Sequence, residues 1–183
     1  MIILASASPR RREILTNAGI DYIVHPSSFD EKSIEINDIN LITKVLSYHK
    51  AKDVQKVYPN DIIIESDTIV SINNEILGKP SNKKEAYDML SKLQGKTHKV
   101  ITGVCILYKK RKFNFQTISH VTFDKMTNNE INEYIDTLEP MDKAGAYAIQ
   151  GKACKYIKSI KGDYYSIVGL PINKVVKCLN KLK

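Results

Sequence analysis

The sequence of 183 residues contains few cysteines and no long apolar run, and each absence excludes a class of protein. Its three cysteines, Cys105, Cys154 and Cys178, are odd in number, lie far apart and form no Cys-x-x-Cys pair. A disulfide framework and a structural zinc site are therefore not expected, and we expect a protein of the reducing cytoplasm. No apolar run approaches the roughly 18 residues of a membrane span. The first basic cluster follows the first apolar residues, which is the reverse of the order in a signal peptide.

The signatures of several common catalytic sites are also missing. The G-x-x-x-x-G-K-[ST] spacing of a P-loop is absent, as are the H-E-x-x-H pair of zincins and the G-x-S-x-G turn of serine hydrolases. The four histidines show no close metal-ligand spacing, and we interpret them as structural or exposed: His25, His49, His98 and His120.

What remains is an ordinary globular composition with an excess of positive charge. Hydrophobic residues make up 43% and charged residues 26%, and the length suits one domain over residues 1–183. The net charge of +8 admits nucleic acid, anionic membranes or phosphorylated small molecules as partners. Only Lys109–Lys112 forms a tight basic run, and its place between two strand-like segments predicts a solvated hairpin tip.

Hydrophobic periodicity and turn residues predict interspersed strands and helices. Ser8 followed by Pro9 predicts a helix start, and Asn82 and Thr127 each precede a glutamate at capping-box spacing. Because hairpins and helices both occur, we expect an α/β fold with a mixed twisted sheet flanked by helices. The predicted strands are 1–5, 61–72, 99–108, 113–124, 155–160 and 164–168, and the predicted helices are 8–19, 38–57, 82–95, 127–138 and 171–182.

The first candidate site is the stretch LASASPRRR, which places Arg10, Arg11 and Arg12 at a helix start. Cations there oppose the helix dipole, so a negative ligand would explain them. Free N–H groups at a helix start and guanidinium forks both bind phosphate, and Ser6 offers a hydroxyl in the preceding turn. The alternative is that the arginines point outward and pair with acidic side chains.

The second candidate is Asp67 in the stretch ESDTIV, inside a segment that otherwise reads as a buried strand. A carboxylate is unfavourable there unless it is paired or binds a metal. It fits a general base that orients water, or a ligand for a hard cation. The alternative is an aspartate that caps a turn at the strand end. Glu65 shares its face by strand periodicity, and an exposed strand-edge glutamate explains it equally well.

Two loops complete the set of candidates. Lys79 lies between glycine and proline, a stiff position from which an ammonium could face a phosphate, although a surface loop explains it too. In the stretch PMDKAGAYAIQG, Gly145 and Gly151 allow close backbone approach, and Tyr147 or Gln150 could contact a base or sugar. A turn with a packed tyrosine is the alternative.

Taken together, the stretches LASASPRR, ESDTIV, GKP, HKVITGV, DKAGAYAIQG and GDYYSIVGLP resemble, in order, the Maf family of nucleoside triphosphate pyrophosphatases. The resemblance implies cleavage of the α–β phosphoanhydride of a nucleoside triphosphate, with release of a monophosphate and pyrophosphate. It also implies a divalent cation, Mg or Mn, and an elongated two-lobed α/β fold similar to inosine triphosphate pyrophosphatases. A homodimer with no nucleic-acid or membrane partner is expected.

The resemblance assigns roles position by position. The positions that match family motifs are Asp67, Lys50 and Lys79 for catalysis, Ser6, Arg10, Arg11, Thr68 and Gln150 for substrate binding, and Glu31 and Asp67 for the metal. Arg12 lies outside the matched pair and is expected to be exposed. DTIV followed by AYAIQG resembles the branch of the family that prefers dTTP and UTP. The alternatives are the branch that favours 7-methyl-GTP, since Ala148 stands where glycine is common, and a non-enzymatic regulator that binds nucleotides or nucleic acid.

Overall fold

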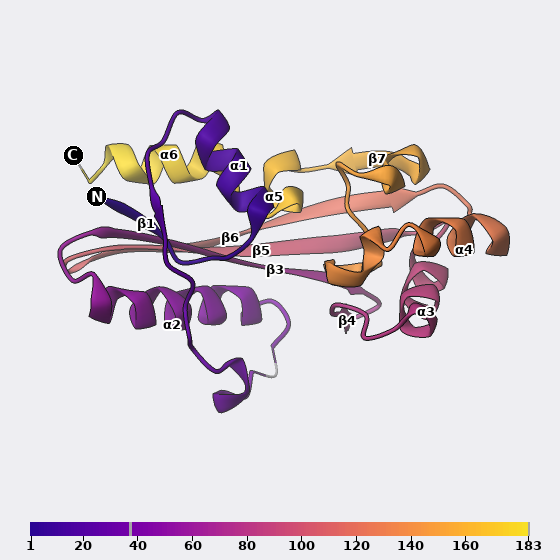
Figure 1. Ribbon diagram of the computed structural model, residues 1–183, viewed down its shortest axis with the longest axis horizontal. Coiled ribbons are helices and arrows are strands. Elements are labelled where there is room, and N and C mark those ends of the chain that lie inside the picture. The colour runs from indigo at the N-terminus through magenta and orange to yellow at the C-terminus, as the bar shows by residue number, and fades with distance from the viewer. Residues whose placement is uncertain (37, 183) are drawn as a thin grey trace. The chain divides into compact units, whose positions relative to one another are not determined.

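The computed structural model describes residues 1–36 and 38–182, and their strands form a seven-stranded mixed sheet (Figure 1). The order is β2-β1-β3-β5-β6-β7, with β4 paired to β3. β1 runs parallel to both β2 and β3, whereas β4 is antiparallel to β3 and β7 to β6. The strands are β1 (Ile2–Leu4), β2 (Ile23–Val24), β3 (Ile62–Ile72), β4 (Glu75–Leu77), β5 (Thr97–Tyr108), β6 (Arg111–Phe123) and β7 (Ile157–Lys161).

Local capping signals explain where several helices begin. Asn82 Oδ1 accepts from the backbone of Glu85 at the start of α3, and Thr127 and Glu130 form a complete capping box at α4. No helix in the described part of the chain is both long enough and apolar enough to span a bilayer. The α-helices are α1 (Pro9–Asn17), α2 (Ile42–Val57), α3 (Lys83–Leu93), α4 (Asn128–Asp136), α5 (Tyr164–Val168) and α6 (Ile172–Asn180). Short 3-10 helices are η1 (Glu31–Ser33), η2 (Glu139–Asp142), η3 (Ala144–Ala146) and η4 (Lys152–Tyr156).

The described residues divide into two compact units, each with its own core. The first unit comprises Met1–Asp67, Thr102–Thr117 and Gly169–Lys183. In it, α2 covers one face of the sheet, and α1 and α6 lie over the other (Figure 1). Its core contains a cluster of buried apolar residues: Ile3, Ala5, Ala51, Val54, Ile63, Cys105 and Leu107.

The second unit comprises Thr68–Ile101 and Ile118–Val168, so the boundary falls within β3. Its larger core joins α3 and α4 to the strands and to the 139–156 segment. Members of this cluster include Val70, Leu90, Phe123, Ile135, Tyr147 and Ile149. The prediction of a mixed α/β sheet flanked by helices is confirmed, and one domain over residues 1–183 stays a prediction.

Two predicted elements differ in the structure. Residues 164–168, expected as a strand because of their aromatic and β-branched side chains, form the helix α5. Asp163 starts this helix, since its Oδ1 accepts from Ser166 N at 3.2 Å and its carbonyl oxygen accepts from Ser166 Oγ at 2.7 Å. The helix α2 begins at Ile42 rather than Asp38, because the Asp38 carboxylate instead closes a turn with Asn40 N at 2.8 Å.

Candidate functional site

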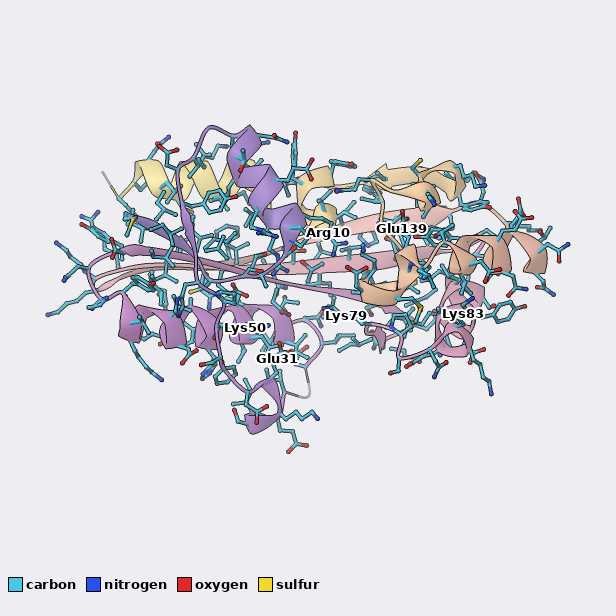
Figure 2. The ribbon with its side chains drawn as sticks, in the orientation of Figure 1. Arg10, Glu31, Lys50, Lys79, Lys83 and Glu139 are labelled. Carbon is cyan, nitrogen blue, oxygen red and sulfur yellow. The ribbon has the colours of Figure 1, made fainter. Side chains whose placement is uncertain are left out.

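The centre of the candidate site is an ammonium held between two carboxylates of the first unit. Lys50 Nζ lies 2.6 Å from Oε1 of Glu31, and both residues are labelled in Figure 2. The same Nζ lies 2.9 Å from Asp67 Oδ1. Lys50 comes from α2 and Glu31 from η1. Asp67 comes from β3, where it is the last residue that belongs to this unit. The Lys50 and Asp67 side chains are 15% and 14% exposed, whereas Glu31 is 55% exposed. Burial lowers the pKa of Lys50, but the charge of Asp67 and the hydrogen bonds to both carboxylates outweigh it, so the pKa is raised.

Glu65 lies two residues before Asp67 on β3, and its carboxyl group is buried. One of its oxygens, Oε2, has no hydrogen-bond partner among the described residues. Burial raises the pKa of Glu65 to about 8, against the opposing charges of Arg11 and Lys50. The alternative of an exposed strand-edge glutamate is therefore wrong, because the side chain is buried.

The arginine-rich turn is organised around Ser6 and the carbonyl group of Gly169. Arg11 donates through one Nη to Ser6 Oγ at 2.8 Å and through Nε to Gly169 O at 3.1 Å. Ser66 Oγ donates to the same carbonyl oxygen at 2.7 Å. The structure thus brings Ser6 and Arg11 together, and Arg12 is exposed as predicted.

Arg10 lies in the first turn of α1 and is half-buried (Figure 2). Ser8 occupies the N-cap position, yet its side chain makes no capping hydrogen bond, and no acidic residue lies in the first turn. The helix dipole therefore gives the start of α1 positive character. Such a helix start suits an anion.

Lys79 and Thr68 belong to the second unit. Lys79 is exposed on the loop between β4 and α3, and Thr68 is half-buried at the start of this unit's part of β3. Gly145 N donates to Gly78 O at 3.0 Å and so fixes the loop next to Lys79. Gly145 has φ +68°, and a Cβ there would lie 2.8 Å from Val70, so glycine is required at this position.

In the neighbouring segment, the side chain of Gln150 is exposed whereas that of Tyr147 is buried. Gln150 is exposed on a turn, as a ligand-contacting residue requires. Tyr147 is instead buried in the core, where its hydroxyl group lies 2.8 Å from His98 Nε2. The prediction that Tyr147 contacts a base or sugar is therefore wrong, and the alternative of a turn with a packed tyrosine is correct. Sequence reasoning did not select Ser66, whose only signal is a hydroxyl inside an apolar strand.

The oxygen donors of the first unit fit a hard divalent cation completed by a ligand. Glu31 and Asp67 contact one ammonium, so their carboxylates converge on a small volume, and the orphaned Glu65 Oε2 lies on the same strand as Asp67. Mg²⁺ is commonly held by one or two carboxylates together with substrate phosphates rather than by a closed protein cage. No cluster of three or more His, Cys, Asp or Glu side chains suited to a metal occurs among residues 1–36 and 38–182.

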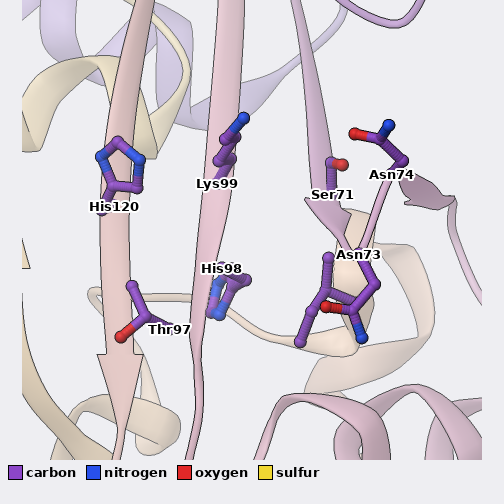
Figure 3. A pocket seen from close by; sticks show the side chains of 8 residues that line it. Ser71, Asn73, Asn74, Thr97, His98, Lys99 and His120 are labelled. Atoms are coloured by element: carbon purple, nitrogen blue, oxygen red, sulfur yellow. The ribbon is translucent and has the colours of Figure 1, made fainter.

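A separate pocket of about 380 Å³ lies in the second unit (Figure 3). Burial and the nearby charge of His120 lower the pKa of His98 to about 4, and His98 Nδ1 has no partner among the described residues. None of the sequence-predicted site residues lines this pocket. Its lining residues are Ser71, Ile72, Asn73, Asn74, Thr97, His98, Lys99 and His120.

The described residues form a mixed α/β protein whose first unit groups a lysine with two carboxylates and carries an arginine-rich helix start. The fold is similar to that of the Staphylococcus aureus Ham1 protein, which matches 100% of this chain and 99% of its own length with a TM-score of 0.55 and 14% identity. The chain belongs to the family of Maf-like proteins, whose family model matches residues 1–182. The resemblance found in the sequence motifs is thereby confirmed.

Curated relatives match nearly the full length of the chain. The dTTP/UTP pyrophosphatase of Bacillus pumilus is 48% identical over 97% of this chain and 94% of its own. The dTTP/UTP pyrophosphatase of Acholeplasma laidlawii is 45% identical over 100% and 95%, respectively. That of Alkaliphilus oremlandii is 49% identical over 95% and 92%.

Proposed function

We propose that this chain is a nucleoside triphosphate pyrophosphatase. It hydrolyses the α–β phosphoanhydride of dTTP and UTP to the monophosphate and pyrophosphate, a house-cleaning activity of nucleotide metabolism. The observation that carries the proposal is the convergence of Lys50, Asp67 and Glu31 in a member of the Maf-like family. The substrate follows from relatives of 45% to 49% identity that are named dTTP/UTP pyrophosphatase.

The residues of the first unit carry the hydrolytic step. Asp67 orients the attacking water and accepts its proton. The water oxygen bonds to the α-phosphorus, and the bond between that phosphorus and the oxygen that bridges it to the β-phosphorus breaks. Lys50 forms an ion pair with Asp67 and so holds its carboxylate in place. Glu31 and Asp67 would hold Mg²⁺ or Mn²⁺, which when bound neutralises phosphate charge and polarises the phosphoryl group.

Further residues bind the triphosphate and the base. Ser6, Arg10 and Arg11 receive phosphate oxygens, and the ammonium of Lys79 balances the charge that develops on the pyrophosphate leaving group. Thr68 and Gln150 contact the pyrimidine base. Support for these roles comes from exposed or half-buried positions for Arg10, Arg11, Thr68, Lys79 and Gln150, and from the Arg11–Ser6 hydrogen bond.

Location and assembly are part of the same proposal. We place the enzyme in the cytoplasm, where its nucleotide substrates occur, and infer that it acts as a homodimer without a nucleic-acid partner. The excess of basic residues then serves the attraction of anionic nucleotides.

A pyrophosphate-release assay over a panel of nucleoside triphosphates tests the function. The panel contains dTTP, UTP, dCTP, CTP, GTP and 7-methyl-GTP, each with Mg²⁺, with Mn²⁺ and with EDTA. We expect release from dTTP and UTP that EDTA abolishes and added metal restores. Preference for 7-methyl-GTP would assign the chain to the other branch, and silence over the whole panel from folded protein would leave a non-enzymatic nucleotide-binding role.

A further inference from the structure

The turn that carries Gln150 presents this side chain from a fixed backbone. Gly151 N donates to Ala148 O at 3.0 Å and closes a four-residue turn with Ile149 and Gln150 at its tip. Ile149 is buried in the core of the second unit, whereas Gln150 is exposed. Of the two tip side chains, Ile149 therefore anchors the turn and Gln150 is the one available to a ligand.

The carboxylate of Glu139 holds the far end of this turn. Lys152 N donates to both oxygens of Glu139, at 2.9 and 3.1 Å. Gly151 packs against the same group so closely that a Cβ there would lie 2.4 Å from Oε1. Hydrogen bonds to an ionised acceptor are stronger than neutral ones, so Glu139 fixes where the turn ends.

The hydroxyl group of Tyr134 on α4 holds the near end. Ala148 N donates to Tyr134 Oη at 3.2 Å, and the same hydroxyl donates to Glu139 Oε1 at 2.8 Å. Burial raises the pKa of Tyr134, and the hydrogen bond to Glu139 acts in the same direction, so the phenol keeps its proton. Glu139 thus fixes both ends of the turn, one directly and the other through Tyr134.

We propose that Glu139 is the positioning residue that fixes Gln150 for recognition of the pyrimidine base, an inference that rests on the proposed function. An amide side chain presents one acceptor and two donors. Thymine and uracil present a donor at N3 beside an acceptor at O4, whereas cytosine presents the reverse arrangement. A Gln150 held in one orientation distinguishes these bases, and a mobile Gln150 turns its amide to suit either.

The test compares Glu139→Gln, Tyr134→Phe and Gln150→Ala with the wild-type protein. Glu133→Gln is the matched control, because Glu133 lies exposed on the same helix as Tyr134. Pyrophosphate release is measured from dTTP and from dCTP with Mg²⁺. Glu139→Gln and Tyr134→Phe are expected to raise the KM for dTTP about tenfold and to lower the dTTP-over-dCTP preference by a similar factor. The kcat for dTTP stays within about twofold of the wild-type value.

Combination with Gln150→Ala separates positioning from stability. Added to Gln150→Ala, Glu139→Gln is expected to cause no further rise in KM, since its effect acts through Gln150. A wild-type KM in Glu139→Gln, or a full additional rise in the double variant, would overturn the inference while the dTTP activity of the wild type stands. An inactive wild-type protein would overturn the proposed function itself. If Glu139→Gln does not fold, as judged by its thermal midpoint, Tyr134→Phe decides by the same two criteria.

Discussion

The ammonium of Lys50 lies 2.9 Å from Asp67 Oδ1, and this ion pair joins α2 to the middle of β3 in a largely buried position. The two residues are 17 positions apart in the sequence. An isolated charge in such a place would be unfavourable, so each residue compensates the burial of the other residue's charge. The same ammonium also contacts Glu31, so the pair brings Asp67 close to a second carboxylate.

Replacing Asp67 by asparagine tests the proposed catalytic centre. Asparagine keeps the size of the side chain but neither accepts a proton nor supplies a negative ligand. We expect Asp67→Asn to lower pyrophosphate release from dTTP by at least about a thousandfold. The thermal midpoint should change little, because Lys50 retains Glu31 as a partner. The exposed Asp21→Asn serves as the control, and near wild-type turnover in Asp67→Asn would remove Asp67 from the mechanism.

Arg11 is expected to act through the geometry of its guanidinium group and not only through its charge. Its hydrogen bonds to Ser6 Oγ and Gly169 O need donors in a planar fork that lysine lacks. Arg11→Lys should therefore lower kcat/KM for dTTP by about 10- to 100-fold. Steady-state kinetics beside Arg12→Lys, at an exposed arginine of the same helix, provides the comparison. An unchanged kcat/KM in Arg11→Lys would show that the charge alone matters, and equal losses in both variants would show that the effect is not specific to Arg11.

The sequence predicted the parts of the fold that depend on local interactions. The helix starts at Asn82 and Thr127 were correct because each cap bonds to a backbone group three residues away. The strand expected at 164–168 was wrong because its helix depends on Asp163, which is itself held by Ser119 through Asp163 N at 3.0 Å. Ser119 lies 44 residues away, so no local pattern contains this interaction.

The candidate site shows the same division between local and distant interactions. Asp67 was singled out from the sequence alone, because a carboxylate within an apolar strand is conspicuous. Lys50 was ordinary by pattern and entered through the family resemblance. The burial of Glu65 could not be read from strand alternation, since it depends on how distant segments cover the strand. Glu139 and Tyr134 act on the backbone of another segment, which leaves no periodic signal.

His98 is expected to make the protein less stable in acid. Its pKa is about 4 in the folded protein against an ordinary value of 6.5, mainly because of burial. Below pH 6.5 the unfolded chain takes up a proton that the folded protein does not, so the stability present above pH 6.5 falls as the pH is lowered towards 4. The loss from this group amounts to about 3 kcal/mol.

Urea unfolding at pH 7 and pH 4.5 measures this effect. His98→Gln should be less stable than the wild type at pH 7, because the hydrogen bond to Tyr147 changes, and should lose less stability on acidification. His49→Gln, at a histidine outside this core, should keep the wild-type pH dependence. Parallel losses in all three proteins would show that His98 does not cause the acid sensitivity.

Gly103 in the middle of β5 is expected to tolerate no side chain. A Cβ at this residue would lie 2.3 Å from both the backbone carbon and oxygen of Thr43, and these atoms cannot rotate away as the end of a flexible side chain can. Gly103→Ala must therefore displace the start of α2 from the strand. We expect the free energy of unfolding to fall by about 1–3 kcal/mol. The displacement also reaches the catalytic centre, because α2 carries Lys50, so pyrophosphate release should fall as well.

Gly78→Ala is the control for stability, since no atom lies within 4 Å of its added Cβ. Chemical denaturation of the two variants gives the comparison, and equal stability of Gly103→Ala and the wild type would show that α2 and β5 separate at no cost.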